Sequence, residues 1–172
     1  MKKAISTPID VAIVAVAETA GSALYGMLDV LLSVGNIWQT LVRTDSAATQ
    51  FRVRIISPTG DAFTCGHGIP VRPDLSIDES PEPQIVILPE LWLGPDEHLR
   101  GRYPELMSWI RDQHVRGASI YSACSGAVML AETGLLDQCE ATSHWGYQDL
   151  FQKYYPKVCF RPEPNLVFAD PS

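Results

Sequence analysis

The sequence has no excess of basic residues, no long apolar run and no paired cysteines, and each absence excludes a class of protein. Its 13 Lys and Arg stand against 20 Asp and Glu, which gives a net charge of −7. That charge argues against a dedicated basic surface for nucleic acid or for an anionic membrane. The apolar segment of residues 11–17 is too short to cross a membrane and is followed at once by Glu18. No basic helix-turn-helix pattern is present either, so we expect no specific DNA binding by this segment.

Cysteine usage indicates the compartment. The four cysteines, Cys65, Cys124, Cys139 and Cys159, show no C-x-x-C spacing, and the N-terminus lacks the pattern of a signal peptide. We therefore expect a reduced, cytoplasmic protein that holds no metal and no cofactor. A chain of 172 residues is long enough to bury a core without disulfides, and residues 1–172 are predicted to form one domain.

Apolar strand patterns alternate with helical patterns along the chain. Strands are predicted at residues 9–17, 51–57, 84–88 and 118–121, and helices at residues 23–34, 104–116, 126–134 and 147–154. The other segments are an ambiguous stretch at 37–50, a small hairpin or a pair of irregular strands at 61–73, a loop at 74–83, an irregular lid at 91–103, and at most a short strand at 166–168. This alternation predicts an α/β fold with a doubly wound, mostly parallel sheet and helices on both faces.

Residues 118–134 carry the strongest local pattern. A short strand leads to Cys124, which has the small residues Ser122 and Gly126 two positions before and after it, and a helix follows. Small neighbours are what a sharp strand-to-helix turn requires, so the pattern predicts a nucleophile elbow with sulfur as the nucleophile. Such a cysteine faces the free N–H groups of the first helical turn, which favour a thiolate. The alternative is that Cys124 is a small apolar residue of the core.

Two carboxylates are expected near this thiol. Glu18 follows the first predicted strand and Glu90 follows the strand at residues 84–88, as Cys124 follows the strand of the elbow. In a parallel sheet the carboxyl ends of the strands meet at one edge, where ligands bind. The three side chains are therefore predicted to border one pocket. The alternative for each glutamate is a solvated position in a loop.

Two motifs connect the chain to a known superfamily. The segment S-A-C-S-G-A-V-M-L-A-E-T-G-L-L-D at residues 122–137 and the segment A-T-S-H-W-G-Y-Q-D-L at residues 141–150 resemble the class I glutamine amidotransferase-like superfamily, which includes the ThiJ and PfpI proteins. The resemblance is greatest to the N-terminal domain of GlxA-type regulators of the AraC family. It implies a flavodoxin-like fold, a homodimer, an unknown small-molecule ligand, and DNA binding only through a helix-turn-helix domain that this sequence lacks. It also implies that the closing strand and helix of the domain are absent, so the chain is expected to be truncated at its C-terminus.

The same comparison exposes three departures from the enzymes of the superfamily. Ala23 occupies the place of their acidic residue at the start of the first helix, and Glu90 follows Pro89 where they carry glycines that supply an oxyanion-hole N–H. Ser125 stands where some members have a histidine after the nucleophile. His144 is the only histidine that fits the family pattern, and a structural hydrogen bond before the last helix is favoured over catalysis.

Two functions follow from this resemblance. The leading hypothesis is a non-catalytic ligand-sensing or redox-sensing and dimerisation domain of an AraC-family regulator. The pocket is then predicted to contain Cys124, Ser125, Gly126, Glu90 and His144. The alternative is a cysteine-dependent enzyme, an amidase or an isocyanide hydratase-like hydro-lyase, in which Cys124 attacks carbon, the Ser125 N–H donates to the oxyanion, and Glu18 or Glu90 replaces the lost acid.

Overall fold

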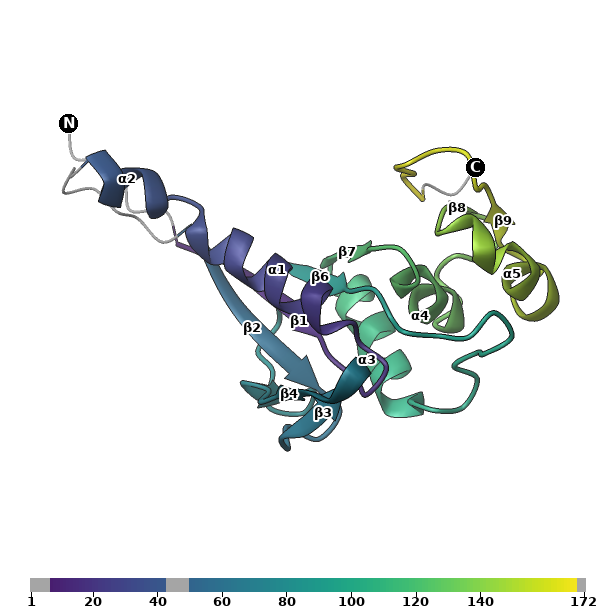
Figure 1. The fold of residues 1–172 in the computed structure, drawn as a ribbon, viewed down its shortest axis with the longest axis horizontal. Helices are drawn as coiled ribbons and strands as arrows, with labels where there is room; N and C mark the ends of the chain where they lie inside the picture. The colour runs from purple at the N-terminus through teal and green to yellow at the C-terminus, as the bar shows by residue number, and fades with distance from the viewer. Residues whose placement is uncertain (1–6, 43–49, 170–172) are drawn as a thin grey trace.

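A five-stranded parallel sheet is the centre of the molecule. The computed structural model describes residues 7–42 and 50–169, so part of the ambiguous segment, residues 43–49, lies outside the described residues. The strand order is β5-β2-β1-β6-β7. The strands are β1 (Ile9–Val14), β2 (Phe51–Ser57), β5 (Leu75–Ser76), β6 (Ile85–Leu88) and β7 (Ser119–Ser122). The doubly wound parallel sheet predicted from the sequence is confirmed (Figure 1).

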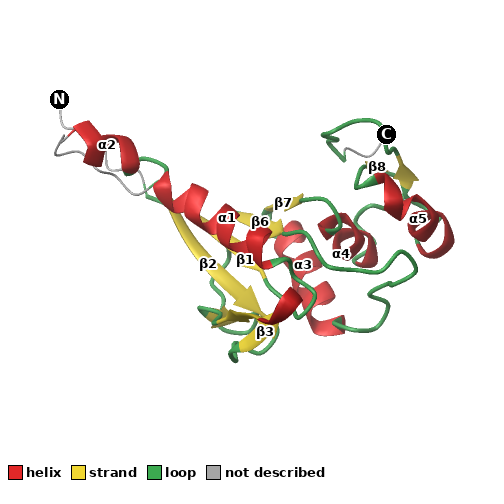
Figure 2. Cartoon of the chain, viewed as in Figure 1, coloured by secondary structure: helices red, strands yellow, loops and turns green. Residues whose placement is uncertain are grey.

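Helices and two small sheets surround this sheet (Figure 2). The helices are α1 (Gly21–Ser33), α2 (Ile37–Val42), α3 (Pro104–Val115), α4 (Gly126–Glu132) and α5 (Gln148–Tyr154), with 3₁₀ turns η1 (Gly66–Gly68) and η2 (Trp145–Tyr147). The small sheets pair β3 (Phe63–Cys65) with β4 (Ile69–Val71), and β8 (Glu140–Ala141) with β9 (Cys159–Phe160). No helix in the described residues is both long and apolar enough to cross a membrane.

Strand β1 contributes to two separate hydrophobic cores because successive side chains of a strand face opposite sides of the sheet. Val11 and Ile13 pack with Leu24 of α1 on one face. Ala12 and Val14 pack on the other face with the buried side of α3 and with α4 and α5. Both faces of the sheet are therefore covered, which explains the continuous apolar run of residues 11–17 in the sequence.

Helix α1 covers the sheet with only one narrow side. An apolar stripe from Leu24 to Leu32 is expected from the sequence, yet only Gly21 and Leu24 are buried, and Leu32 remains 49% exposed. At about 100° per residue Leu32 lies beside the stripe of Leu24 and Leu28 rather than on it. Figure 1 shows α1 continuing into α2, which extends away from the rest of the molecule.

One local prediction is corrected by the structure. The segment 74–83 is predicted to be a loop, but Leu75 and Ser76 form β5, because the Ile77 N–H donates to the Ser57 carbonyl at 3.0 Å and extends the edge of the sheet. Residues 166–168, where the sequence predicts at most a short strand, form no strand. The hairpin predicted at residues 61–73 is confirmed as the antiparallel pair of β3 and β4.

Candidate functional site

The predicted elbow is present at the junction of β7 and α4. Cys124 has a left-handed backbone with φ of 50°, a conformation that few non-glycine residues adopt. The Ala123 N–H donates to the Leu88 carbonyl at 3.0 Å and holds the turn against the end of β6. At Gly126 a Cβ atom would overlap the Leu88 carbonyl oxygen and lie 2.7 Å from that of Pro89. The close backbone at the end of β6 therefore requires glycine at position 126.

The side chain of Ser125 points from the elbow into the protein interior. Its hydroxyl is fully buried, accepts from the Leu91 N–H at 2.8 Å and donates to the Leu91 carbonyl at 2.7 Å. Both polar groups of Leu91 are thus satisfied by one side chain. This hydroxyl is committed to the fold and does not face a ligand, whereas oxyanion binding by the Ser125 N–H stays a prediction.

Glu90 lies beside the thiol. Its Oε1 atom is 3.9 Å from the Cys124 Sγ, the distance of a weak sulfur hydrogen bond. The chain around Glu90 is held by the connection between β1 and α1, since the Glu90 carbonyl accepts from the Ala20 N–H at 2.8 Å and the Trp92 N–H donates to the Glu18 carbonyl at 2.6 Å. The carboxylate predicted at this strand end is therefore brought to the sulfur on a well-held segment.

Glu18 has a different partner set. Its side chain, only 15% exposed, accepts from the Arg102 guanidinium at 2.7 Å and from the Tyr103 hydroxyl at 2.6 Å. Burial, and then the bond to Glu18, raise the pKa of Tyr103. Arg102 also binds Glu97 at 2.8 Å, and hydrogen bonds from the Gly94 N–H and from Arg102 lower the pKa of Glu97. Glu18 thus fixes the irregular segment 91–103 to the connection between β1 and α1, and it makes no hydrogen bond to Cys124 among the described residues.

Tyr147 is a residue of the site that the sequence did not single out. Its hydroxyl donates to the Leu93 carbonyl at 3.1 Å. Burial chiefly raises the pKa of Tyr147; the charges of Cys124 and Glu90 add to this, and interaction with the Ser125 hydroxyl opposes it. The one sequence signal for Tyr147 is its position in the segment 141–150. A helix pattern by itself gives no information about a contact with a distant loop.

His144 lies at the rim of the site. It is exposed, and its Nδ1 atom accepts from the Gly146 N–H at 3.1 Å at the start of η2. Its ring centroid lies 4.9 Å from that of Trp145. This is the structural hydrogen bond that the sequence favoured for His144.

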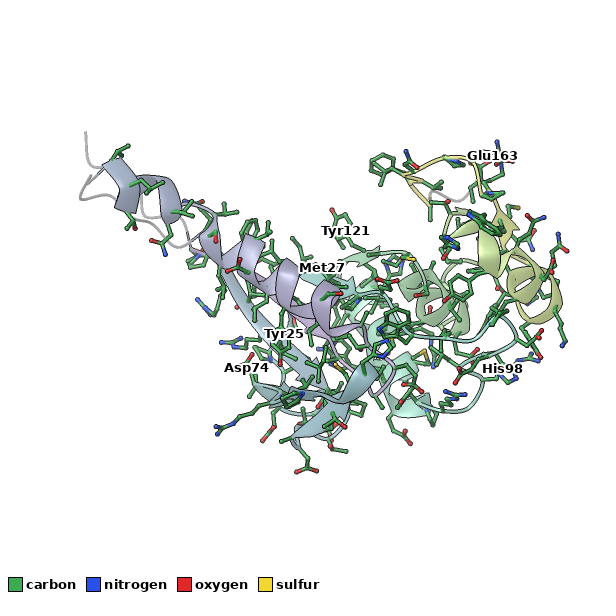
Figure 3. The ribbon with its side chains drawn as sticks, viewed as in Figure 1. Tyr25, Met27, Asp74, His98, Tyr121 and Glu163 are labelled. Atoms are coloured by element: carbon green, nitrogen blue, oxygen red, sulfur yellow. The ribbon has the colours of Figure 1, made fainter. Side chains whose placement is uncertain are left out.

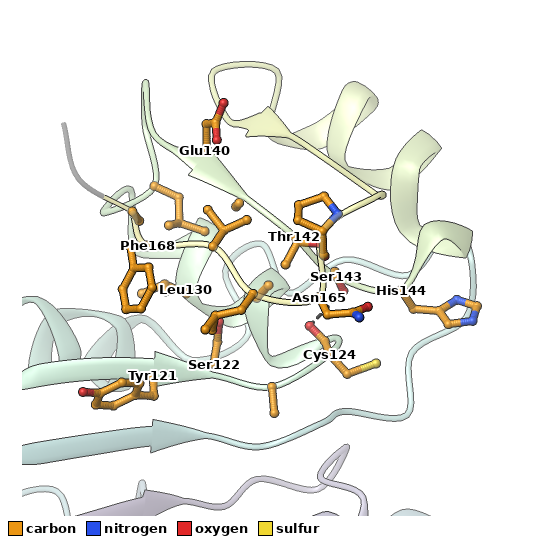
Figure 4. Close-up of a pocket in the computed structure, with 18 of the residues that line it drawn as sticks. Tyr121, Ser122, Cys124, Leu130, Glu140, Thr142, Ser143, His144, Asn165 and Phe168 are labelled. Atoms are coloured by element: carbon orange, nitrogen blue, oxygen red, sulfur yellow. Dashed lines mark hydrogen bonds between the residues drawn. The ribbon is translucent and has the colours of Figure 1, made fainter. Parts of the chain in front are cut away.

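A cavity of about 660 Å³ opens between the elbow, β8 and the segment 162–169 (Figure 4). Of the five expected pocket residues, Cys124 and His144 line it, while Ser125, Gly126 and Glu90 do not. Its wall is mostly apolar, and the described residues that line it include no Lys or Arg.

Tyr121 stands out from the edge strand β7 and is 54% exposed (Figure 3). Within the described part of the chain no group of three His, Cys, Asp or Glu is arranged to hold a metal ion.

The four thiols differ in access, which predicts their order of alkylation. Cys124 and Cys159 are exposed, whereas Cys65 and Cys139 are buried, and burial raises the pKa of the Cys65 thiol. Brief treatment of the folded protein with iodoacetamide at neutral pH should label the exposed Cys124 and Cys159, and the buried pair only after unfolding. Peptide mass mapping over time measures this order. Labelling of Cys65 before Cys124 would contradict the accessible elbow.

Comparison with known proteins gives consistent matches. The sequence model described as the DJ-1/PfpI family matches residues 32–163. The HTH-type transcriptional regulator CdhR of Pseudomonas aeruginosa is 29% identical over 116 residues, which cover 67% of this chain and 33% of the regulator. Isonitrile hydratase of Pseudomonas putida is 28% identical over 131 residues, or 74% of this chain and 48% of the enzyme. The crystal structure of an AraC family transcriptional regulator from Pseudomonas putida has a TM-score of 0.67 at 21% identity and covers 94% of this chain and 80% of that one. The chain therefore spans less than half the length of these two curated relatives.

Proposed function

The chain belongs to the DJ-1/PfpI family, and on that premise we propose that it is the ligand-sensing or redox-sensing and dimerisation domain of an AraC-type transcriptional regulator. Similarity to the HTH-type regulators CdhR and GbdR supports this assignment. DNA contact then belongs to a separate helix-turn-helix domain, in keeping with the net charge of −7.

The observation that carries the proposal is an exposed thiol at a strained turn beside a cavity. Cys124 lines that cavity, and its thiol donates a weak hydrogen bond to Glu90. A ligand that fills the cavity contacts the thiol directly. Peroxide is the oxidant in the redox form of the proposal: the sulfur gains one oxygen to give sulfenic acid, and water is released.

The same geometry supports a role without turnover. During attack on a substrate, negative charge develops on a substrate oxygen, and enzymes stabilise it with hydrogen-bond donors. A carboxylate next to the nucleophile opposes that charge instead. Glu90 occupies such a position, 3.9 Å from the Cys124 sulfur. Ala23, in the first turn of α1, offers no acid in its place. The second candidate is a cysteine-dependent amidase or isocyanide hydratase-like enzyme, and the similarity to isonitrile hydratase favours it.

Dimerisation is supported by the apolar surface of α1 and α2. Val30 and Leu32 of α1 and Ile37 and Leu41 of α2 are all exposed, and α2 extends away from the rest of the molecule (Figure 1). Exposed apolar side chains on a projecting element are a common feature of protein interfaces.

We expect the purified protein to show no turnover above background on amides or isonitriles, because both the acid and a glycine-lined oxyanion site are replaced. Substrate loss and product formation are followed by chromatography, with Cys124→Ala as the control. Ala23→Asp is expected to raise the rate if that carboxylate reaches the sulfur. Robust turnover that Cys124→Ala abolishes would contradict the sensor and establish the enzyme, with Glu18 or Glu90 as the acid.

A further inference from the structure

The surroundings of the Cys124 sulfur carry negative charge. Glu90 lies 3.9 Å from the sulfur, and the charges of Glu90 and Cys124 both raise the pKa of Tyr147, which places the three groups within electrostatic range of one another. The first turn of α4 contributes the opposite sign. A helix terminus presents at most about half a unit charge, however, which is less than the full charge of the Glu90 carboxylate.

Glu90 differs from the other carboxylates around the site because it has no ion pair among the described residues. Glu140, which lines the cavity, is paired with Arg161 at 2.7 Å. Glu18 is paired with Arg102 at 2.7 Å. Glu90 itself does not line the cavity, and the described residues that do line it include no Lys or Arg.

We propose that the Cys124 site is selective for positively charged ligands, with an ammonium or guanidinium group paired to Glu90 and the apolar remainder in the adjoining cavity. This inference rests on the proposed sensing function and names the class of its ligand. A cation beside Glu90 gains a counter-ion in a half-buried position, where attraction is stronger than in bulk water. An anion placed there meets Glu90, and the described lining of the cavity offers no Lys or Arg to hold it.

The test uses two thiol reagents that differ only in charge, an aminoethyl and a sulfonatoethyl methanethiosulfonate. In both cases the Cys124 thiolate attacks the sulfenyl sulfur, the new S–S bond forms, methanesulfinate leaves with the electron pair, and the thiol proton goes to solvent. Rates at Cys124 are measured by peptide mass mapping at low ionic strength. The ratio of the cationic to the anionic rate should be about tenfold higher in the native protein than in Glu90→Gln, as expected for one unit charge about 6 Å from the probe charge. Added salt should reduce this difference.

A matched variant separates a local charge from the net charge of the protein. Glu105→Gln changes the net charge equally at an exposed position on α3 and should leave the ratio unchanged. Equal ratios in the native protein and in Glu90→Gln, with Cys124 reactive to both reagents, would overturn the charge selectivity while the sensing function stands. A Cys124 that reacts with neither reagent in the folded protein would instead contradict the accessible sensor thiol itself.

Discussion

Replacing Gly126 with alanine is expected to destabilise the fold by about 3 kcal/mol or more, at the upper end of the cost of overpacking a well-packed site. The added Cβ would overlap the Leu88 carbonyl oxygen and lie 2.7 Å from that of Pro89. Both are backbone atoms, so no side chain can turn aside, and α4 must shift against β6. For a domain of this size the loss corresponds to a melting temperature lower by about 6–12 °C. Thermal unfolding followed by circular dichroism measures it.

Gly26 offers the matched control. It lies within α1, and a Cβ there meets no atom within 4 Å. Gly26→Ala should stabilise the protein by about 0.5–1 kcal/mol, because glycine is a poor helix former. If Gly126→Ala melted within two or three degrees of the native protein, the close approach of the elbow to β6 would be refuted.

Ser125→Ala is expected to cost about 2–4 kcal/mol. The hydroxyl satisfies both the N–H and the carbonyl of Leu91, at 2.8 and 2.7 Å, and Leu91 is only 1% exposed. Leaving two buried backbone groups without partners costs about 1–3 kcal/mol each, and water that enters the site offsets part of the loss. The free energy of unfolding from urea titration, read with fluorescence, is the measurement.

Ser122→Ala is the corresponding control on the other side of the elbow. Ser122 is exposed on β7, and its substitution should change the free energy of unfolding by less than about 0.5 kcal/mol. Equal stabilities for the two variants would show that the Ser125 hydroxyl does not support the segment after β6. A large loss for Ser125→Ala alone would confirm the connection between the elbow and that segment.

The elbow is the part of the site that local sequence predicts best. Its strand, turn and helix are continuous in residues 118–134, and the need for a small residue at Gly126 follows from the sharpness of the turn. The position of Glu90 just after β6 is likewise predictable, because that strand is an unbroken apolar run. Glu18 follows the apolar run of residues 11–17, but β1 already ends at Val14. The 3.9 Å separation of Glu90 from Cys124 is consistent with the shared edge of a parallel sheet.

The hydrogen-bond partners of these side chains could not be predicted from the sequence. Glu18 binds Arg102 and Tyr103, which lie 84 and 85 positions further along the chain. Tyr147 reaches Leu93 across 54 positions. No periodicity or spacing encodes such contacts, because they depend on the path of the irregular segment 91–103 over the ends of the strands.

The sequence by itself determined the parallel α/β fold, the elbow at Cys124 and the position of Glu90, because each depends on patterns within some twenty residues. Only the tertiary structure decided that the Ser125 hydroxyl faces the protein, that Glu18 anchors a loop, and that Tyr147 joins the site. The physical reason is that a hydroxyl or carboxylate binds whichever partner the packed chain brings within about 3 Å. That choice is made by contacts between segments far apart in the sequence, after the local elements have formed.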